Sequence, residues 1–285
     1  MQSKTAVKIL SFCLAFWCGQ SLLAQNNSLS YLAKANYATQ RLALDSLVYN
    51  IGENPDEKSI EAFNNFKNWA ANQKNQELIS NIILHEFRIK IRSNNNRLDS
   101  INEIKLLEFL NSKNTDKLNY IRTDALFILA CSYFNKKKYA LSMRYHYSAH
   151  EAYSKYTADE FPFLEDYYYE YGRIYYFFKD FKKAASIYKQ AWNAIPYNKF
   201  RGGKATRMNT LALCFKNMSQ FDSAIYYFSK AQKMAIESNE EVWEGILSGN
   251  VADIYATQKR YDEAIPLLMK NIEISKKYVK WQYPA

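Results

Sequence analysis

The sequence predicts an all-α protein, a right-handed α-solenoid built of helical hairpins, and three observations lead to this prediction. Glycine and proline are scarce, at 7 and 5 residues in 285, whereas sandwiches, barrels and propellers need turn residues at intervals of about 8–12 positions. Hydrophobic residues make up 48% of the chain and charged residues 23%, which is ordinary for a folded protein. The second half also repeats itself with a spacing of 40 to 42 residues, which is typical of a solenoid.

Residues 1–24 have the pattern of a secretory signal peptide. Lys4 and Lys8 form a basic start, Ile9–Trp17 is almost entirely apolar, and a small residue, Ala24, ends the segment. This is the order of regions in an export signal. We expect cleavage after Ala24 and a periplasmic or secreted protein without a transmembrane span, because no apolar run reaches about 20 residues. An uncleaved anchor and a lipoprotein are the alternatives.

The charge balance excludes some partner classes. The chain carries 38 basic and 28 acidic residues, and loss of the signal removes two lysines and no acids, so that the net charge falls from +10 to +8. A positive balance on an exported protein favours acidic surfaces, glycans or anionic lipid headgroups. Nucleic acid is not expected as a partner in that compartment, and the densest basic run, Lys136–Lys138, lies in a predicted turn.

Residues 25–120 are predicted to form N-terminal helical hairpins. Apolar residues recur at three- and four-residue spacing in four segments, which are Ser28–Asn50, Glu57–Asn72, Gln76–Arg92 and Leu98–Asn111. Ile51–Pro55 and Asn94–Asn96 separate some of them as breaks. The four helices form either two degenerate repeats or a cap with different packing. No long linker follows, so one continuous array is the simpler interpretation.

Residues 121–285 are predicted to contain four repeat units, at about 123–164, 165–204, 205–244 and 245–280. The aromatic residue before each second helix is Tyr139, Phe181, Phe221 or Tyr261, with spacings of 42, 40 and 40. Each first helix has a small residue at one position (Ala130, Gly172, Ala212 and Ala252), which lets two backbones approach closely. Asp222 and Asp262 are predicted N-caps of the second helices.

This pattern resembles the tetratricopeptide repeat. The second unit has residues of the expected kinds at that family's spacing, namely Tyr168, Tyr171, Gly172, Tyr175, Ala184, Tyr188, Ala191 and Pro196. The resemblance covers about residues 123–280, and the period exceeds the family's usual length of about 34 residues. It implies a superhelix whose first helices line a concave, partner-binding groove.

The resemblance also implies which residues face that groove. The predicted partner-binding residues are Tyr169, Arg173, Tyr176, Asn209, Lys216 and Asn217. Asp124 and Phe127 take the corresponding places in the first unit, and Phe177 is a further groove position of the second unit. Arginine and aromatic side chains in such a groove are suited to anchor an extended segment or a helix.

The remaining cysteines are expected to be free. Cys131 and Cys214 lie on the first helices of units one and three. Non-adjacent repeats of a solenoid do not touch, and a disulfide needs Cα atoms within about 7 Å. We therefore predict two mostly buried thiols.

No catalytic or metal-binding constellation is predicted, and no cofactor. His146 and His150 are four apart on a helix and could share a metal, but the order of residues differs from the zinc protease motif. His146 also falls where the repeat expects an aromatic residue, so it should be packed inside. Gly202-Gly203-Lys204 lacks the first glycine and the Ser/Thr of a phosphate-binding loop, which indicates an inter-repeat turn.

These observations predict a non-enzymatic interaction or scaffold protein of the bacterial envelope that binds a protein or peptide in the groove. Its Lys/Asn/Tyr-rich composition resembles that of Bacteroidota exported proteins. The alternative is the sensor region of a histidine kinase or DNA-binding regulator, whose membrane and output parts are missing from this chain. Solenoids need a polar terminal cap, and the sequence stops just after the last predicted helix. That helix is expected to be exposed and to pair with a second copy, or to be covered by further chain.

Overall fold

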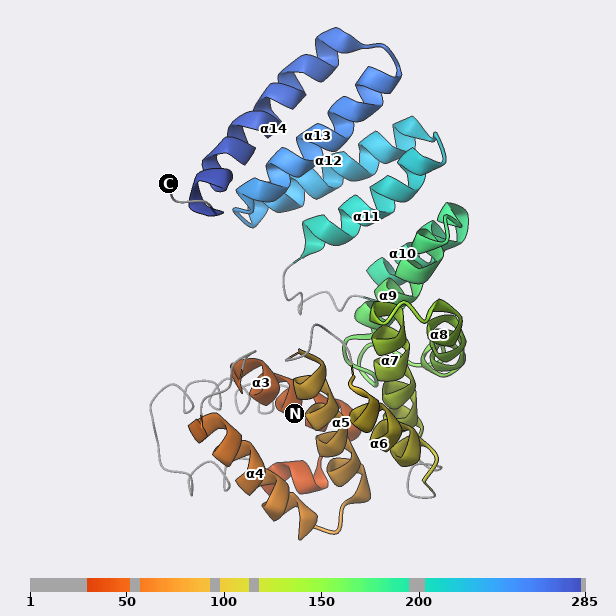
Figure 1. Cartoon of the computed structure of the whole chain (residues 1–285), viewed down its shortest axis with the longest axis vertical. Helices are drawn as coiled ribbons and strands as arrows, with labels where there is room; N and C mark the ends of the chain where they lie inside the picture. The colour runs from red at the N-terminus through yellow and green to blue at the C-terminus, as the bar shows by residue number, and fades with distance from the viewer. Residues whose placement is uncertain (1–29, 52–56, 93–97, 113–117, 195–202, 283–285) are drawn as a thin grey trace. The chain divides into compact units, whose positions relative to one another are not determined.

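The computed structural model describes residues 30–51, 57–92, 98–112, 118–194 and 203–282. Within these ranges the secondary structure consists of one 3-10 helix and twelve α-helices, with no strand (Figure 1). The predicted all-α class of helical hairpins is confirmed. The predicted signal peptide lies outside the described residues, as do Pro196 and Gly202. In the part of the chain that is described, no helix combines the length and the apolar character needed to cross a membrane.

The contacts divide the chain into two compact units, residues 1–163 and residues 164–285. The division falls at the junction of the first and second predicted repeat units. The domain assignment that begins the repeats near residue 121 stays a prediction. We call the two parts the N-terminal unit and the C-terminal unit and describe each by itself.

The N-terminal unit agrees with the predicted helices except at its start. Its elements are η1 Ser30–Lys34, α3 Tyr37–Ile51, α4 Glu57–Ala71, α5 Gln76–Arg92, α6 Ser100–Leu110, α7 Asn119–Asn135 and α8 Tyr139–Tyr153. The predicted continuous helix Ser28–Asn50 is wrong, because the chain breaks between η1 and α3. Asn36 causes this break, since its Oδ1 accepts a hydrogen bond from the Thr39 N–H at 3.0 Å and so caps a new helix.

The C-terminal unit consists of three consecutive helical hairpins. Its helices are α9 Leu164–Phe177, α10 Phe181–Asn193, α11 Lys204–Asn217, α12 Phe221–Glu237, α13 Glu241–Thr257 and α14 Tyr261–Gln282. Helix α9 packs on α10, α11 on α12 and α13 on α14, while α10 contacts α11 and α12 contacts α13. A core that includes Tyr188, Leu211, Phe215, Phe228 and Leu247 runs through these contacts.

The turn inside each hairpin follows one plan in both units. Lys137, Lys179, Ser219 and Lys259 all have a left-handed backbone, with φ of 61°, 62°, 58° and 61°. The next N–H then bonds back to a carbonyl five residues earlier, as Asp180 does to Tyr175 at 3.0 Å. This is the Schellman arrangement, which usually has glycine at the left-handed position.

The turn plan corrects the predicted caps. The N-cap of α12 is Gln220, and Asp222 and Asp262 lie within the first turns of α12 and α14. There their negative charges interact favourably with the positive end of the helix dipole, but neither residue is the N-cap of its helix. Asp180 is a true N-cap, because its side chain accepts a hydrogen bond from the Lys183 N–H at 3.0 Å.

Gly172 leaves room for the side chain of Tyr188. A Cβ atom built on Gly172 would lie 2.6 Å from Cε1 and 2.8 Å from Cδ1 of the Tyr188 ring. The close approach at this position is therefore between the α9 backbone and an aromatic ring of α10. Ala130, Ala212 and Ala252, at the equivalent positions, are fully buried.

The two described cysteines are both free, as predicted. Cys214 is fully buried in the core of the C-terminal unit, and burial raises the pKa of its thiol to about 12. Cys131 is less buried but still mostly covered. The prediction of two mostly buried thiols is therefore confirmed.

Candidate partner-binding surface

The six predicted partner-binding residues lie on two neighbouring first helices of the C-terminal unit. Tyr169, Arg173 and Tyr176 belong to α9, and Asn209, Lys216 and Asn217 belong to α11. We call the side of α9 and α11 that carries these residues, together with the adjacent first helix α13, the first-helix surface.

A ladder of polar contacts connects the first helices of successive hairpins. Each contact joins residues that are 41 positions apart, and the contacts are Asp166 with Arg207, Tyr169 with Thr210, Tyr176 with Asn217 and Asn209 with Asn250. The Tyr169 and Thr210 hydroxyls share a hydrogen bond of 3.1 Å. The Asn250 Nδ2 donates to Asn209 Oδ1 at 2.8 Å. The ladder fixes the spacing of the first helices, so the surface is held in one shape.

The ladder separates structural from accessible residues among the six. Asn209 is buried beneath its contact with Asn250, so it serves packing between repeats. Tyr169, Arg173, Tyr176 and Lys216 are partly exposed and Asn217 is exposed. These five are the predicted residues that a partner can reach.

Charges on the first-helix surface occur in pairs. Arg173 forms an ion pair with Glu170, with Nη2 and Oε2 2.6 Å apart, and Lys216 forms one with Asp253 of α13. Burial raises the pKa of Glu170, the nearby Arg173 opposes this, and Asp166 adds to it. Partly exposed ion pairs contribute little to stability, so they can exchange partners when a charged ligand arrives.

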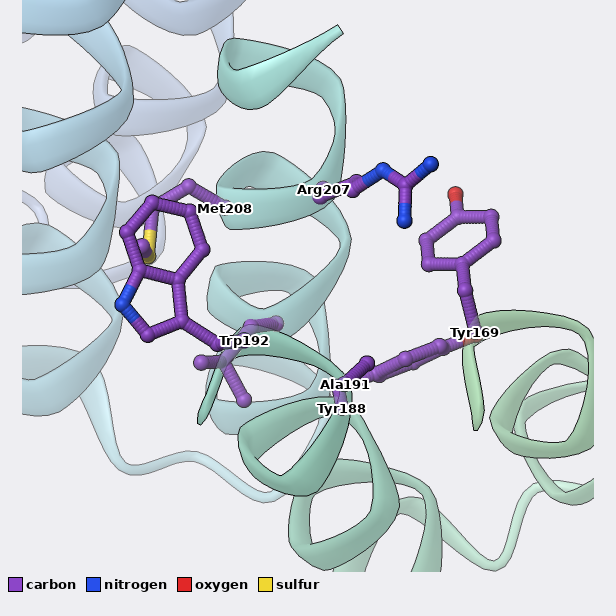
Figure 2. Close-up of a pocket in the computed structure, with 7 residues that line it drawn as sticks. Tyr169, Tyr188, Ala191, Trp192, Arg207 and Met208 are labelled. Atoms are coloured by element: carbon purple, nitrogen blue, oxygen red, sulfur yellow. The ribbon is translucent and has the colours of Figure 1, made fainter. Parts of the chain in front are cut away.

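A small cavity lies between α9, α10 and α11 (Figure 2). Its lining residues are Tyr169, Tyr188, Ala191, Trp192, Arg207, Met208 and Leu211. The Arg207 guanidinium lies over the Tyr169 ring at 5.3 Å from its centroid, and burial raises the pKa of Tyr188. The cavity volume is about 10 Å³, room for roughly one water molecule. It has no room for a side chain of a partner.

Two exposed phenylalanines lie at the C-terminal end of α9, Phe177 as its last residue and Phe178 as the first residue of the turn. Phe177 and Phe178 are 46% and 52% exposed, and their rings meet edge to face at 5.4 Å. Tyr176, next to them, accepts a hydrogen bond from Asn217 Nδ2 at 3.3 Å. The sequence placed Phe177 at a groove position, but it gave no sign that both phenylalanine rings stay in solvent.

The N-terminal unit encloses the residue that is equivalent to Asp166. Asp124 of α7 is completely buried, although the repeat pattern placed it in the groove. Its Oδ2 lies 2.9 Å from Arg41 Nη1 and accepts a hydrogen bond from the Tyr37 hydroxyl at 3.3 Å, and Arg88 forms a second ion pair with it. Helices α3 and α5 supply these partners and so enclose Asp124.

Two other sequence-based expectations can be placed. His146 is buried, as predicted, and its ring meets Phe127 edge to face at 6.0 Å. Gly203 precedes α11 with a left-handed φ of 73°, which fits the expected inter-repeat turn. Among the described residues, no three His, Cys, Asp or Glu side chains gather as a metal site would require.

Comparison with known proteins supports the repeat architecture. The sequence profile of the tetratricopeptide repeat family matches residues 165–198 and 248–278, so these segments are tetratricopeptide repeats. The first segment contains α9 and α10, and the second contains the C-terminal part of α13 and most of α14. No curated protein is significantly similar to the chain in sequence.

Two solved structures share the fold. The apo form of RapI superimposes with a TM-score of 0.62 at 18% identity, covering 85% of this chain and 66% of RapI. The Cut9–Hcn1 hetero-tetramer of APC/C gives a TM-score of 0.52 at 17% identity, covering 89% of this chain and 43% of the other. The chain therefore spans just under two thirds of RapI and less than half of the second protein.

Proposed function

We propose that this protein is a non-enzymatic interaction protein that binds an extended peptide or protein segment on its first-helix surface. One observation carries the proposal. A rigid surface, held by the polar ladder, places the exposed rings of Phe177 and Phe178 beside Tyr176, Lys216 and Asn217. Large aromatic side chains exposed next to polar groups mark interaction sites on soluble proteins.

The chemistry of the surface defines the kind of segment that would bind. Phe177 and Tyr176 can hold an apolar or aromatic anchor, because burying their rings removes apolar area from water. Arg173 and Lys216 can each transfer from Glu170 or Asp253 to a carboxylate of the partner. We therefore expect a segment with one large apolar side chain next to an acidic residue. Because the ladder holds the surface in place, little conformational entropy is lost on binding.

The cellular setting is also proposed. The signal-like residues 1–24 support a place in the bacterial envelope. The alternative, that this chain is the sensor region of a histidine kinase or DNA-binding regulator, uses the same binding surface. A transmembrane helix encoded downstream in the same reading frame would favour the sensor, and a native stop codon after Ala285 would exclude it.

Selection from a random peptide library displayed on phage tests the proposed function. The full chain is the target, and enriched peptides are then measured by calorimetry. The test variant is Phe177→Ala with Lys216→Ala, and the matched control is Asp253→Asn. The control breaks the same ion pair as the test variant but keeps the lysine.

We expect enriched peptides to combine an aromatic or aliphatic residue with an acidic one. Their Kd should rise at least tenfold in the test variant, because about 1.4 kcal/mol of binding energy corresponds to a factor of ten. Binding to Asp253→Asn should be equal or tighter, because Lys216 is released from its competitor. Equal binding by the wild type and the test variant would move the site away from this surface and refute the proposal.

A further inference from the structure

The last helix, α14, leaves an apolar stripe uncovered. Tyr261, Ile265, Leu268, Met269 and Ile272 follow one another at three- and four-residue spacing, and all are exposed. Leu268 is 40% exposed and Met269 is 61% exposed. Residues with this spacing share one helical face. This stripe, which we call the α14 stripe, lies apart from the first-helix surface, which belongs to α9, α11 and α13.

The internal repeat shows what kind of element such a stripe accepts. Leu268 is equivalent to Phe228 of α12 and, one unit earlier, to Tyr188 of α10, and both of those side chains are buried. The cover comes from the first helix of the following hairpin, since α11 contacts α10 and α13 contacts α12. The shape that fits Leu268 is therefore a helix laid along α14.

One residue distinguishes α14 from the inner repeats. Met269 is equivalent to Lys189 of α10 and Ser229 of α12, and both remain exposed although their helices are covered. A following repeat therefore does not reach this position. An apolar methionine here requires a cover broader than the helix of a next repeat. The exposed Ile272 beside it, equivalent to the partly buried Trp192 and Gln232, continues the apolar area.

The charges along α14 select the orientation of that cover. Asp262 and Glu263 lie in the first turn, whereas Lys276 lies at the far end of the stripe, and all three are exposed. If two copies of α14 cross antiparallel near Leu268 and Met269, Lys276 of one copy meets the first turn of the other. A parallel pair would instead place like charges together. Antiparallel pairing also brings opposite ends of the two helix dipoles together.

We propose that two copies of this chain associate through the α14 stripe as an antiparallel, two-fold symmetric helix pair. Such an interface uses the same patch on both copies. Met269 and Leu268 lie at its centre and the Asp262–Lys276 contacts lie at its two ends. Each first-helix surface remains open in this dimer, because α14 carries none of its residues, so the dimer would bind two segments at once.

Sedimentation velocity of the full chain across roughly 1–100 µM tests the proposal. The first variant is Met269→Ser with Ile272→Gln, which introduces the residues that α12 has at these positions and so preserves the fold. The second set is Asp262→Lys, Lys276→Glu and the two combined. Circular dichroism confirms that each variant keeps the helicity of the wild type.

We expect a concentration-dependent dimer that the Ser/Gln variant weakens at least tenfold. Each single charge reversal should also weaken it, and the combined reversal should restore it. A chain that stays monomeric at 100 µM, or a dimer unaffected by the Ser/Gln variant, overturns the proposal. If the single charge reversals left the association unchanged, the pair would be parallel, because like residues would face each other before and after each change, and the proposed orientation would be overturned.

Discussion

Asp124 and Asp166 occupy the same position of two successive repeats, yet their surroundings are opposite. Asp124, in the N-terminal unit, is completely buried between Arg41 and Arg88. Asp166, in the C-terminal unit, pairs with Arg207 alone, and its side chain is 44% exposed. The repeat position fixes the direction in which a side chain points. The neighbouring helices decide whether that direction leads into a core or toward solvent.

This contrast concerns the start of the first helix, because Phe127, Cys131 and Phe134 farther along α7 are partly exposed. In the N-terminal unit, α3 and α5 supply the groups that enclose Asp124, and an aromatic cluster forms where the rings of Tyr37, Tyr120 and Phe161 stack. In the C-terminal unit the same face carries only the ladder, and side chains beside it remain accessible. The N-terminal unit uses the start of this helix for stability, and we propose that the C-terminal unit uses its first helices for binding.

The largest effect should come from removing the carboxylate that the N-terminal unit buries. We expect Asp124→Asn to lower the free energy of unfolding by about 3–5 kcal/mol, because it leaves two buried guanidinium groups without their counter-charge. Asp166→Asn should cost at most about 1 kcal/mol, since its ion pair with Arg207 is partly exposed. Urea denaturation followed by circular dichroism measures both. Equal effects of the two substitutions would remove the distinction between the units.

The second test concerns how each unit fills one position of its first helix. Gly172→Ala places a Cβ against the Tyr188 ring, and such overpacking typically costs about 1–3 kcal/mol. The N-terminal unit has Ala130 and His146 at these two positions. There the ring is smaller than that of Tyr188, and the residue opposite it has a Cβ atom. Thermal unfolding of Gly172→Ala measures the cost.

Two controls make the glycine test specific. Adding Tyr188→Leu to Gly172→Ala reproduces the Ala252–Leu268 combination of the last hairpin and should recover part of the loss. Gly249→Ala approaches only the flexible end of Asn271 and gains about 1 kcal/mol of helix propensity, so it should be neutral or stabilising. A cost for Gly249→Ala as large as that for Gly172→Ala would contradict the packing explanation.

A pH-dependent effect is expected in the N-terminal unit. Burial raises the pKa of Glu103, whereas hydrogen bonds from Lys136 and from the Tyr133 hydroxyl, the latter at 2.9 Å, lower it. The hydrogen bonds have the larger effect together, so the pKa of Glu103 lies below its usual value. The carboxylate therefore stabilises the fold above pH 4.5, and this contribution is lost as the pH falls through the lowered pKa. We expect Glu103→Gln to cost about 1–2 kcal/mol at pH 7.

The pH series supplies its own check for Glu103. The difference between wild type and Glu103→Gln should shrink steadily in urea titrations from pH 6 to pH 2. The exposed Glu108 on the same helix serves as the control, and Glu108→Gln should change little at any pH. A difference that stays constant down to pH 2 would show that Glu103 contributes by packing and not by charge.

The smallest effect should come from the turns, where the two units are alike. Lys179 has a left-handed backbone that glycine adopts without strain, so Lys179→Gly should stabilise the protein by about 0.5–1 kcal/mol. Lys137→Gly should do the same in the N-terminal unit. Gln190→Gly, in the interior of α10, should instead destabilise by about 1 kcal/mol. Differential scanning calorimetry can rank the three variants, and opposite signs for Lys137→Gly and Lys179→Gly would refute a common turn plan.

Periodicity predicted most of the fold, and its failures have local causes. The hairpins at 139, 181, 221 and 261 could be predicted, because one aromatic residue marks the same place in every repeat. The break before Tyr37 could not, because apolar spacing continues through Asn36 and only its side-chain cap reveals the interruption. Asp222 was misplaced by two positions, because nothing in the residue type of Ser219 announces a left-handed backbone.

The binding surface was predicted in outline only. The family's groove positions identified Arg173, Tyr176, Lys216 and Asn217 as partly accessible, but they also included Asn209, which is buried. Arg207, Thr210 and Asn250 were missed, because the ladder joins residues 41 apart whereas the repeats are 40 apart. A search for complementary polar pairs at one residue beyond the period would have found them.

The ladder has a consequence for how this chain can change in evolution. Deleting the 40 residues from Ala205 to Glu244 would keep the hairpin rhythm intact, as repeat duplication and loss usually do. It would nevertheless place Leu247 opposite Asp166 in the position of Arg207, and Thr257 opposite Tyr176 in the position of Asn217. Each hairpin thus carries the matching half of its neighbour's contacts. The repeats are similar in shape but not interchangeable, so their order along the chain is itself under constraint.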